Sequence, residues 1–427
     1  MVDSAFAEIM REATRGSSEV IDLKTLSSVA RMRGGAAEAS IETPIVQMRL
    51  VDVDGFLEWE DATGTAPQLK MFRGANASSA DDSAVELKFD RLPPSRVTEF
   101  LTKRDANLTP ARGLRRYDPR TRSLQKSEVP MDGEILILVH GTFSQGENTL
   151  SNFFATKQGG AFLTQASEKY KGNVFTFDHP TLSVSPILNA FDLQRLLGAS
   201  RAKVRLVCHS RGGLVARWWC ETFDRLGDRC DRAVLVGSPL AGTALAAPPN
   251  IRQTIHLLTQ FSRALQLTAG LTALAVPVFS VVEALIRVVT SITGFAAKTP
   301  VVDAAMAMVP GLFAMSRVGN NPELTRLLSE PARRDRYFAI SSNFEPSRPG
   351  WKFWRHFRKE NLVDHATDAV FDGANDLVVD TPSMIRIGDE SLIESGNRLD
   401  FGDSETVHHL NYFSQPQTID FLADSLL

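Results

Sequence analysis

Five consecutive apolar residues, Ile135 to Val139, are followed directly by His140 and Gly141. A strand with one face in water alternates apolar and polar side chains, whereas an unbroken apolar run fits a strand buried on both faces of a parallel sheet. Such buried strands alternate with helical stretches, and the pattern predicts a doubly wound α/β sheet with right-handed crossovers. The further strand candidates are 173–177, 204–208, 232–237 and 336–341, and the helical stretches are 187–197 and 213–223.

The sequence around Ser210 predicts a sharp turn between one of these strands and a helix. The strand ends at Cys208, and Gly212 and Gly213 follow the serine closely. A nucleophile on such a strained turn needs small neighbours, and its hydroxyl lies at a helix N-terminus that favours developing negative charge. We therefore predict Ser210 as a nucleophile. Cys208 stands where the Gly-x-Ser-x-Gly motif has its first glycine, and we expect a structural thiol there.

A serine nucleophile needs a base to take its proton and a carboxylate to orient that base. When the nucleophile stands on such a turn, the chain order is serine, acid, histidine. His408 and His409 precede a final helical segment, and His409 is the favoured base with His408 as the alternate. Asp376 follows a glycine-containing turn and is the favoured acid. Asp380 and Asp372 are the reserves.

The loop after the first buried strand begins His140-Gly141-Thr142. In lipase-like hydrolases a His-Gly loop at this place presents a backbone N–H group to an oxyanion, together with the amide of the residue after the nucleophile. The predicted oxyanion donors are therefore the amides of Thr142 and Arg211. A plain strand-to-loop turn is the alternative.

Together these motifs resemble those of lipase-like bacterial α/β-hydrolases, which are relatives of the triacylglycerol lipases. The resemblance implies an α/β-hydrolase fold with a helical cap, and a catalytic triad of Ser210, Asp376 and His409. The usual lipase elbow has glycine where this chain has Cys208, a departure that removes no catalytic group. The resemblance covers roughly 134–427 and is carried by HGTF at 140–143, HSRGG at 209–213, VLVGSPLAGT at 234–243, NDLVV at 375–379 and HLNYF at 409–413.

The sequence predicts three regions: a flexible arm at 1–40, a small β-rich module at 41–130, and an α/β-hydrolase domain at 131–427 with a helical cap at about 250–320. The segment from Ile255 to Met315 is apolar, and 264–282 contains no charged residue. Its length would permit a membrane span. Because sheet-forming sequence resumes after it, a cap over Ser210 is favoured, with a buried helix pair or a true span as alternatives.

Composition excludes several classes of protein. The formal net charge of −3 gives no general attraction to nucleic acid, so no nucleic-acid partner is expected. Cys208, Cys220 and Cys230 show no metal-ligand spacing, and neither a disulfide framework nor a zinc site is predicted. No metal or organic cofactor is required. The segment from Met1 to Arg15 lacks the pattern of a secretory signal, so a cytoplasmic location is expected, with export by a signal-less route left open.

These features predict a serine hydrolase that cleaves carboxylic esters through an acyl-enzyme. Lipids or long-chain esters are the first expectation, because the predicted cap is apolar. An acyltransferase with the same triad and a catalytically silent binding or effector protein are the alternatives. The stretch from Trp351 to Lys359 interleaves aromatic and basic residues, which suits either peripheral contact with an anionic membrane or an ordinary amphipathic helix. Protein partners are not predicted.

Overall fold

The chain divides into two compact units, and each is described by itself. Unit 1 comprises Met1–Val97 and Arg252–Ala305, and unit 2 comprises Thr98–Ile251 and Met306–Leu427. The structure is a computed structural model. It describes residues 4–13, 45–53, 56–62, 85–224, 227–247, 250–267, 272–293, 308–317, 321–329, 334–347, 353, 370–371 and 373–427.

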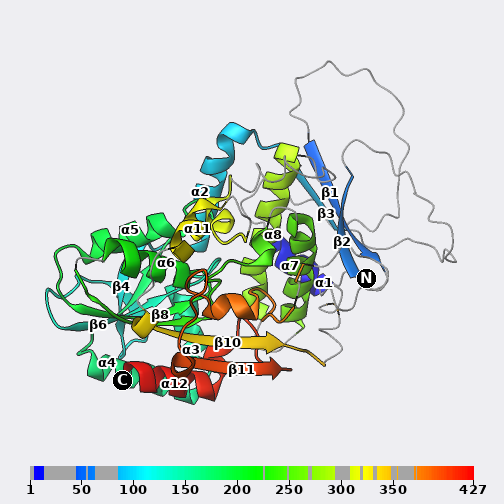
Figure 1. The fold of residues 1–427 in the computed structure, drawn as a ribbon. Helices are drawn as coiled ribbons and strands as arrows, with labels where there is room; N and C mark the ends of the chain where they lie inside the picture. Colours follow the sequence, from blue (N-terminus) through cyan, green and yellow to red (C-terminus); the bar gives the residue numbers. More distant parts are fainter. Residues whose placement is uncertain are drawn as a thin grey trace, which may run out of the picture. The chain divides into compact units, whose positions relative to one another are not determined.

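Unit 2 is built on one eight-stranded sheet with the order β5-β4-β7-β6-β8-β9-β10-β11 (Figure 1). All neighbours from β7 to β11 pair in parallel. At the other edge, β4 pairs antiparallel with both β7 and β5. The strands are β4 (Gly113–Asp118), β5 (Ser123–Lys126), β6 (Glu134–Val139), β7 (Val174–Asp178), β8 (Lys203–His209), β9 (Cys230–Val236), β10 (Tyr337–Phe344) and β11 (Arg398–Ser404).

Helices cover both faces of this sheet (Figure 1). On the lower face in Figure 1, α3, α4 and α12 enclose a core in which Phe153, Phe162 and Leu422 pack with the inward-facing strand residues Leu136 and Val207. On the opposite face α5 packs against α6. The helices of unit 2 are α2 (Val97–Leu108), α3 (Gly146–Phe154), α4 (Lys157–Lys169), α5 (Pro186–Leu197), α6 (Gly212–Trp218), α10 (Pro310–Phe313), α11 (Pro322–Ser329) and α12 (Pro416–Leu426).

The predicted fold class is confirmed. The buried-strand candidates correspond to β6 to β10, and the two helical stretches correspond to α5 and to α6 with the π-helical turn that follows it at Trp219–Phe223. Ile135 to Val139 of β6 are all buried, which explains why their sequence is an unbroken apolar run. Strand β8, which ends one residue before Ser210, lies in the middle of a mostly parallel sheet, as the α/β-hydrolase fold requires.

The predicted boundary at residue 131 is wrong. Strands β4 and β5 lie within the segment assigned to the N-terminal module, yet they form one edge of the main sheet. Leu114 and Tyr117 of β4 are buried, and Tyr117 belongs to the core of unit 2. The α/β unit therefore begins at Thr98. This edge is hard to predict because β4 and β5 are short and carry several polar residues.

Unit 1 joins two parts of the chain that are far apart in sequence. Its three strands form an antiparallel sheet with the order β2-β1-β3. The indole N–H of Trp59 donates to Thr259 Oγ1 at 3.0 Å, and the Phe6 and Phe279 rings meet edge to face at 6.0 Å. The elements are α1 (Ser4–Ala13), β1 (Ile45–Val53), β2 (Phe56–Asp61), β3 (Val85–Asp90), α7 (Ile251–Gln266) and α8 (Thr272–Thr293).

Unit 1 corrects two expectations about the regions outside the main sheet. Part of the predicted flexible arm is helix α1, whose apolar residues Phe6 and Met10 are buried. The rest of 1–40 lies outside the described residues. The inserted segment forms the predicted helices, but α7 and α8 group with the N-terminal module and not with the α/β unit. Their placement over Ser210 stays a prediction.

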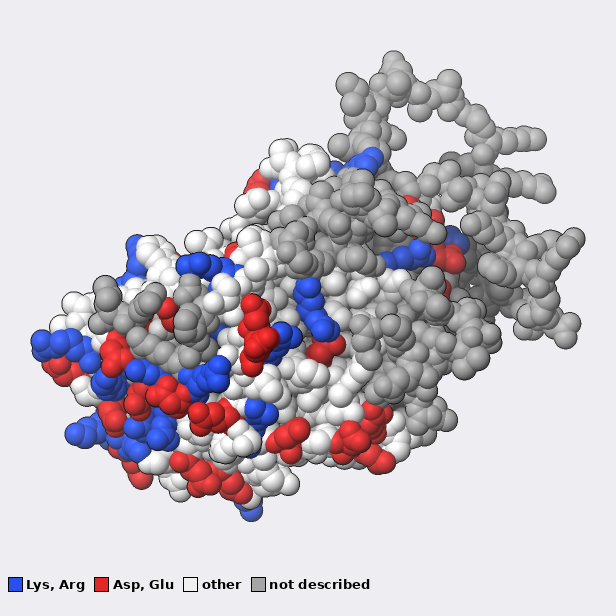
Figure 2. Space-filling view, in the orientation of Figure 1, with Lys and Arg blue, Asp and Glu red and all other residues white. Residues whose placement is uncertain are grey.

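No helix in the described part of the chain is long and apolar enough to cross a membrane. Apart from Phe353, the aromatic and basic stretch from Trp351 to Lys359 lies outside the described residues. On the face of the α/β unit that Figure 2 shows, basic and acidic side chains are interspersed and do not gather into a patch of one sign.

A disulfide joins Cys220 to Cys230, although the sequence indicated no disulfide framework. The connection between the π-helical turn and β9 folds back because the Asp224 carboxylate accepts the amide N–H groups of Arg229 and Cys230, at 2.7 and 2.8 Å. This path brings the two cysteine Cα atoms to 5.6 Å, a separation that spacing along the sequence does not reveal. Disulfides persist mainly in oxidising compartments, so the cytoplasmic location stays a prediction that this bond does not favour.

Reduction of this disulfide should lower the free energy of unfolding by about 2–3 kcal/mol, because the bond closes a short loop in the unfolded chain. Urea unfolding with and without reductant measures the difference. As a control, thiol titration in denaturant should find one reactive cysteine, Cys208, before reduction and three after it. Three reactive thiols in protein prepared under oxidising conditions would contradict the pairing.

Candidate functional site

Ser210 occupies a strained turn between β8 and α6. Its φ is +53°, in the left-handed region that residues other than glycine rarely adopt. The start of α6 lies so close to the sheet that side chains are excluded there. A Cβ atom on Gly212 would lie 2.6 Å from the Val139 carbonyl oxygen, and one on Gly213 would lie 2.3 Å from Ser238 Oγ. Close packing is therefore the reason that small residues are needed beside Ser210, as the sequence predicted.

Cys208 is buried at the end of β8 and forms no disulfide. Burial raises the pKa of its thiol, so the sulfur stays protonated and unreactive. This environment fits the structural thiol expected at this position.

A chain of hydrogen bonds connects Ser210, His409 and Asp376. His409 Nε2 lies 2.9 Å from Ser210 Oγ, and His409 Nδ1 lies 2.8 Å from Asp376 Oδ2. All three residues are buried. The structure thus brings together the three residues that the sequence singled out as nucleophile, base and acid, in the order that proton transfer requires.

The Asp376 carboxylate is fully buried and accepts four hydrogen bonds. Oδ1 accepts the backbone N–H groups of Val378 and Val379, at 3.1 and 2.8 Å. Oδ2 accepts from His409 Nδ1 and from the Tyr412 hydroxyl, which lies at 2.9 Å. A carboxylate has about four lone-pair sites, so its accepting capacity is filled. The orientation of the carboxylate is therefore fixed from both sides.

The backbone of His409 is also held in place. Its amide donates to the Asp376 carbonyl at 3.0 Å, and its carbonyl lies 2.8 Å from His209 Nε2. Burial lowers the pKa of His209 to about 3, so the ring stays neutral and can donate from this nitrogen. Sequence reasoning assigned no role to His209 or Tyr412. Their places directly before the nucleophile and three residues after the base are the only signals that could have pointed to them.

The alternates are engaged elsewhere. The His408 ring packs edge to face on Phe344, and its Nδ1 accepts the Leu410 amide at 3.3 Å. Burial lowers its pKa to about 4. Asp380 forms an ion pair of 3.0 Å with Arg317 and accepts the Ala244 amide. Asp372 lies outside the described residues.

The loop after β6 runs against Ser210. A Cβ atom on Gly141 would lie 2.8 Å from Ser210 Cβ. The Ser210 amide donates to Val236 O, and the Phe143 amide donates to Thr181 Oγ1. Within the described residues, no hydrogen bond engages the amide of Thr142 or of Arg211. Two unused N–H groups beside a serine hydroxyl are what an oxyanion site needs, although their role stays a prediction.

The side chain of Arg211, the residue after Ser210, is fully buried. Its guanidinium donates to the Asn189 side chain at 2.7 Å and to the Gly311 carbonyl at 3.3 Å. Burial lowers its pKa to about 10, which still leaves it charged at neutral pH. Asn189 lies in α5, after β7, and Gly311 lies in α10, before α11. The Arg211 side chain therefore connects these two segments to the turn that carries Ser210.

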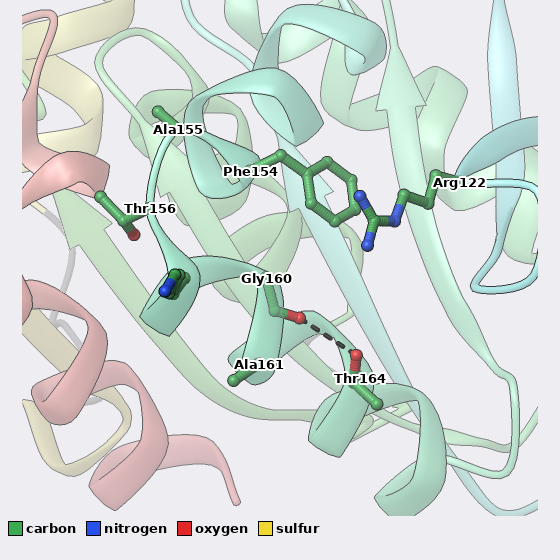
Figure 3. Close-up of a pocket in the computed structure, with 8 residues that line it drawn as sticks. Arg122, Phe154, Ala155, Thr156, Gly160, Ala161 and Thr164 are labelled. Atoms are coloured by element: carbon green, nitrogen blue, oxygen red, sulfur yellow. Dashed lines mark hydrogen bonds between the residues drawn. The ribbon is translucent and has the colours of Figure 1, made fainter.

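A depression of about 480 Å³ lies elsewhere on unit 2 (Figure 3). The Arg122 guanidinium stacks over the Phe154 ring at 5.0 Å, and none of the residues around Ser210 lines the depression. Its lining residues are Arg122, Phe154, Ala155, Thr156, Lys157, Gly160, Ala161 and Thr164.

Among the described residues, no group of three or more histidine, cysteine or acidic side chains could hold a metal ion.

The family described as "Domain of unknown function (DUF7379)" matches residues 107–427. The chain belongs to this family. No curated protein matches the chain significantly.

Among solved structures, the fold is similar to those of bacterial lipases. The mature form of a Bacillus licheniformis lipase is 14% identical with a TM-score of 0.35, and the match covers 70% of this chain and 94% of that one. Lipase 1 from Pelosinus fermentans is 13% identical with a TM-score of 0.37, covering 69% and 99%. A putative hydrolase from Legionella pneumophila is 12% identical with a TM-score of 0.33, covering 77% and 95%. At such identities the likeness concerns the fold and not the reaction.

Gly237 should not tolerate a side chain. Its φ is +54°, and a Cβ atom would lie 2.8 Å from the Tyr412 ring and 3.1 Å from Asp376 Oδ2. Gly237→Ala should therefore lose about 1–2 kcal/mol of stability to backbone strain and a further 1–3 kcal/mol or so to overpacking. Chemical denaturation measures both.

Gly402 offers a matched control, because its φ is +57° and nothing lies within 4 Å of the position that a Cβ atom would take. Gly402→Ala should show the strain cost alone. Equal losses in the two variants would mean that Gly237 is not packed against the acid as described.

Proposed function

We propose that this chain is a serine hydrolase of carboxylic esters, with Ser210 as nucleophile, His409 as base and Asp376 as acid. The observation that carries the proposal is the unbroken hydrogen-bond chain from Ser210 Oγ through the His409 ring to Asp376 Oδ2. Its position supports the same conclusion, because the serine lies on a left-handed turn at the N-terminus of α6, where a nucleophile is exposed to an acyl carbonyl.

The geometry supports an acyl-enzyme mechanism. His409 Nε2 takes the Ser210 proton as Oγ attacks the carbonyl carbon, and Asp376 stabilises the imidazolium and keeps Nδ1–H directed toward itself. The amides of Thr142 and Arg211 bind the oxyanion of the tetrahedral intermediate. Collapse expels the alcohol, which receives the proton from His409. Water, activated by the same histidine, then releases the acid and restores Ser210.

For the substrate, we propose an ester of a long acyl chain or a lipid. The support is the apolar composition of the inserted segment from Ile255 to Met315. A chain-length series of p-nitrophenyl esters tests this, since a lipid-directed site should favour long chains and respond to micelles. Product analysis with and without an acceptor alcohol distinguishes hydrolysis from acyl transfer.

Ser210→Ala should abolish ester hydrolysis and labelling by a fluorophosphonate probe, because it removes only the attacking hydroxyl. A loss on the order of 10⁶ is expected. Circular dichroism and the unfolding midpoint serve as controls for the fold. If the wild-type chain reacts with neither esters nor the probe, the chain is not a serine hydrolase. A variant that keeps most of the wild-type rate would assign the nucleophile to another residue.

The neighbouring histidines and the two aspartates should behave differently. His409→Ala should match the Ser210 variant, whereas His408→Ala should lose about tenfold or less, since its ring has no bond to Ser210. Asp376→Asn should lower kcat by up to about 10⁴ through the wrong imidazole tautomer. Asp380→Asn, which breaks only the contacts with Arg317 and Ala244, is its control. Steady-state kinetics of all four variants decides the assignment, and equal losses in either pair would overturn it.

A further inference from the structure

Tyr412 shares an acceptor atom with the proposed base. Its hydroxyl lies 2.9 Å from Asp376 Oδ2, the oxygen that also lies 2.8 Å from His409 Nδ1. Both donors approach one oxygen, while the other oxygen is occupied by the backbone of its own turn. The hydroxyl therefore competes directly with the imidazole for the negative charge of this carboxylate.

Tyr412 can play this part because it is rigid and fully buried. The residue has no exposed surface and lies in the 3-10 turn Tyr412–Ser414 directly after the loop that carries His409. Gly237 packs against its ring, against Asp376 and against His409. Burial first, and the Asp376 charge second, raise the pKa of Tyr412 well above its usual range. The hydroxyl thus stays protonated near neutral pH and can donate to Asp376.

We infer that Tyr412 is a positioning residue of this site. Its hydroxyl keeps the Asp376 carboxylate oriented toward His409, and it weakens the electrostatic stabilisation that this carboxylate gives to the protonated imidazole. The inference rests on the proposed function and deepens it. A donor to a carboxylate draws negative charge away from the other donor, so the imidazolium is stabilised less than it would be beside a carboxylate bound to histidine alone.

The titratable groups around His409 support this assignment. Within the described residues these are Asp376 and Tyr412, His209 from β8, whose ring centroid lies 4.9 Å away, and the preceding His408. Burial lowers the pKa of His209 to about 3 and that of His408 to about 4, so both are neutral near pH 7. Within this set, Tyr412 and His409 are the side chains that hydrogen-bond to Asp376 Oδ2.

Tyr412→Phe tests the inference, since it removes one oxygen atom and keeps the ring. The acid limb of the pH profile of kcat/KM should move to higher pH by about half a unit to one unit, and kcat should fall about tenfold with little change in KM. In protein labelled with ¹⁵N-histidine, the titration midpoint of the His409 ring should move in the same direction. The Asp376→Asn background should abolish that shift.

Tyr337→Phe is the matched control. Tyr337 is also fully buried, and its hydroxyl donates to the Glu221 carboxylate at 2.9 Å, away from His409. It should lose similar stability and leave both the pH profile and the His409 titration unchanged. If Tyr412→Phe only lowers stability in the same way, Tyr412 is structural and the inference is overturned. If the wild-type chain has no esterase activity, the proposed function fails, yet the His409 titration still decides the inference.

Discussion

The geometry of the site depends on the burial of one carboxylate. An ionised Asp376 without partners would be very costly in the interior, because a buried charge is tolerated only when it is fully hydrogen-bonded. The protein meets this requirement with four donors from two short stretches of chain: the turn of Asp376 itself at Val378 and Val379, and the segment that carries His409, the proposed base, and Tyr412. The same bonds that make the charge tolerable also fix the orientation of the imidazole. Stability and the arrangement of the proposed triad therefore have a common origin.

Ser210, the proposed nucleophile, is positioned by steric exclusion and not by polar contacts alone. Helix α6 begins where the carbonyl oxygen of Val139 and the side chain of Ser238 leave room only for hydrogen at Gly212 and Gly213. Ser210, directly before this close approach, lies at a positive φ. His209, one residue earlier, then reaches the His409 carbonyl from the other side of the turn. The end of β8 thus positions both Ser210 and the backbone of His409.

The sequence predicted those parts of the molecule whose structure is determined by residues close together in the chain. The unbroken apolar run at 135–139 predicted β6, and further largely apolar segments predicted β7 to β10. The strand, turn and helix pattern predicted the turn at Ser210. Burial and tight turns both restrict which residue types a segment can contain. The edge strands β4, β5 and β11 were not predicted, since a half-exposed strand such as Arg398–Ser404 is largely polar. The Cys220–Cys230 bond and the contact from Tyr412 to Asp376 depend on how distant segments converge, which spacing alone does not encode. The grouping of α7 and α8 with the N-terminal strands escaped prediction for the same reason.

The α/β unit accommodates the long insertion because the residues that flank the insertion on its two sides lie next to each other. The chain leaves the unit shortly after β9, and when it returns, the Thr243 amide donates to the Met315 carbonyl at 2.8 Å and Thr243 forms a bridge with Ser316. Neighbouring ends let an insertion emerge without disturbing the body that carries it. Strands β9 and β10 can therefore pair directly although the insertion separates them in sequence. The returning segment also contacts the loop after β6, since Thr142 Oγ1 lies 3.7 Å from Met315 Sδ. The segment by which the insertion rejoins the unit thus contacts Thr142, whose amide is one of the two proposed oxyanion donors.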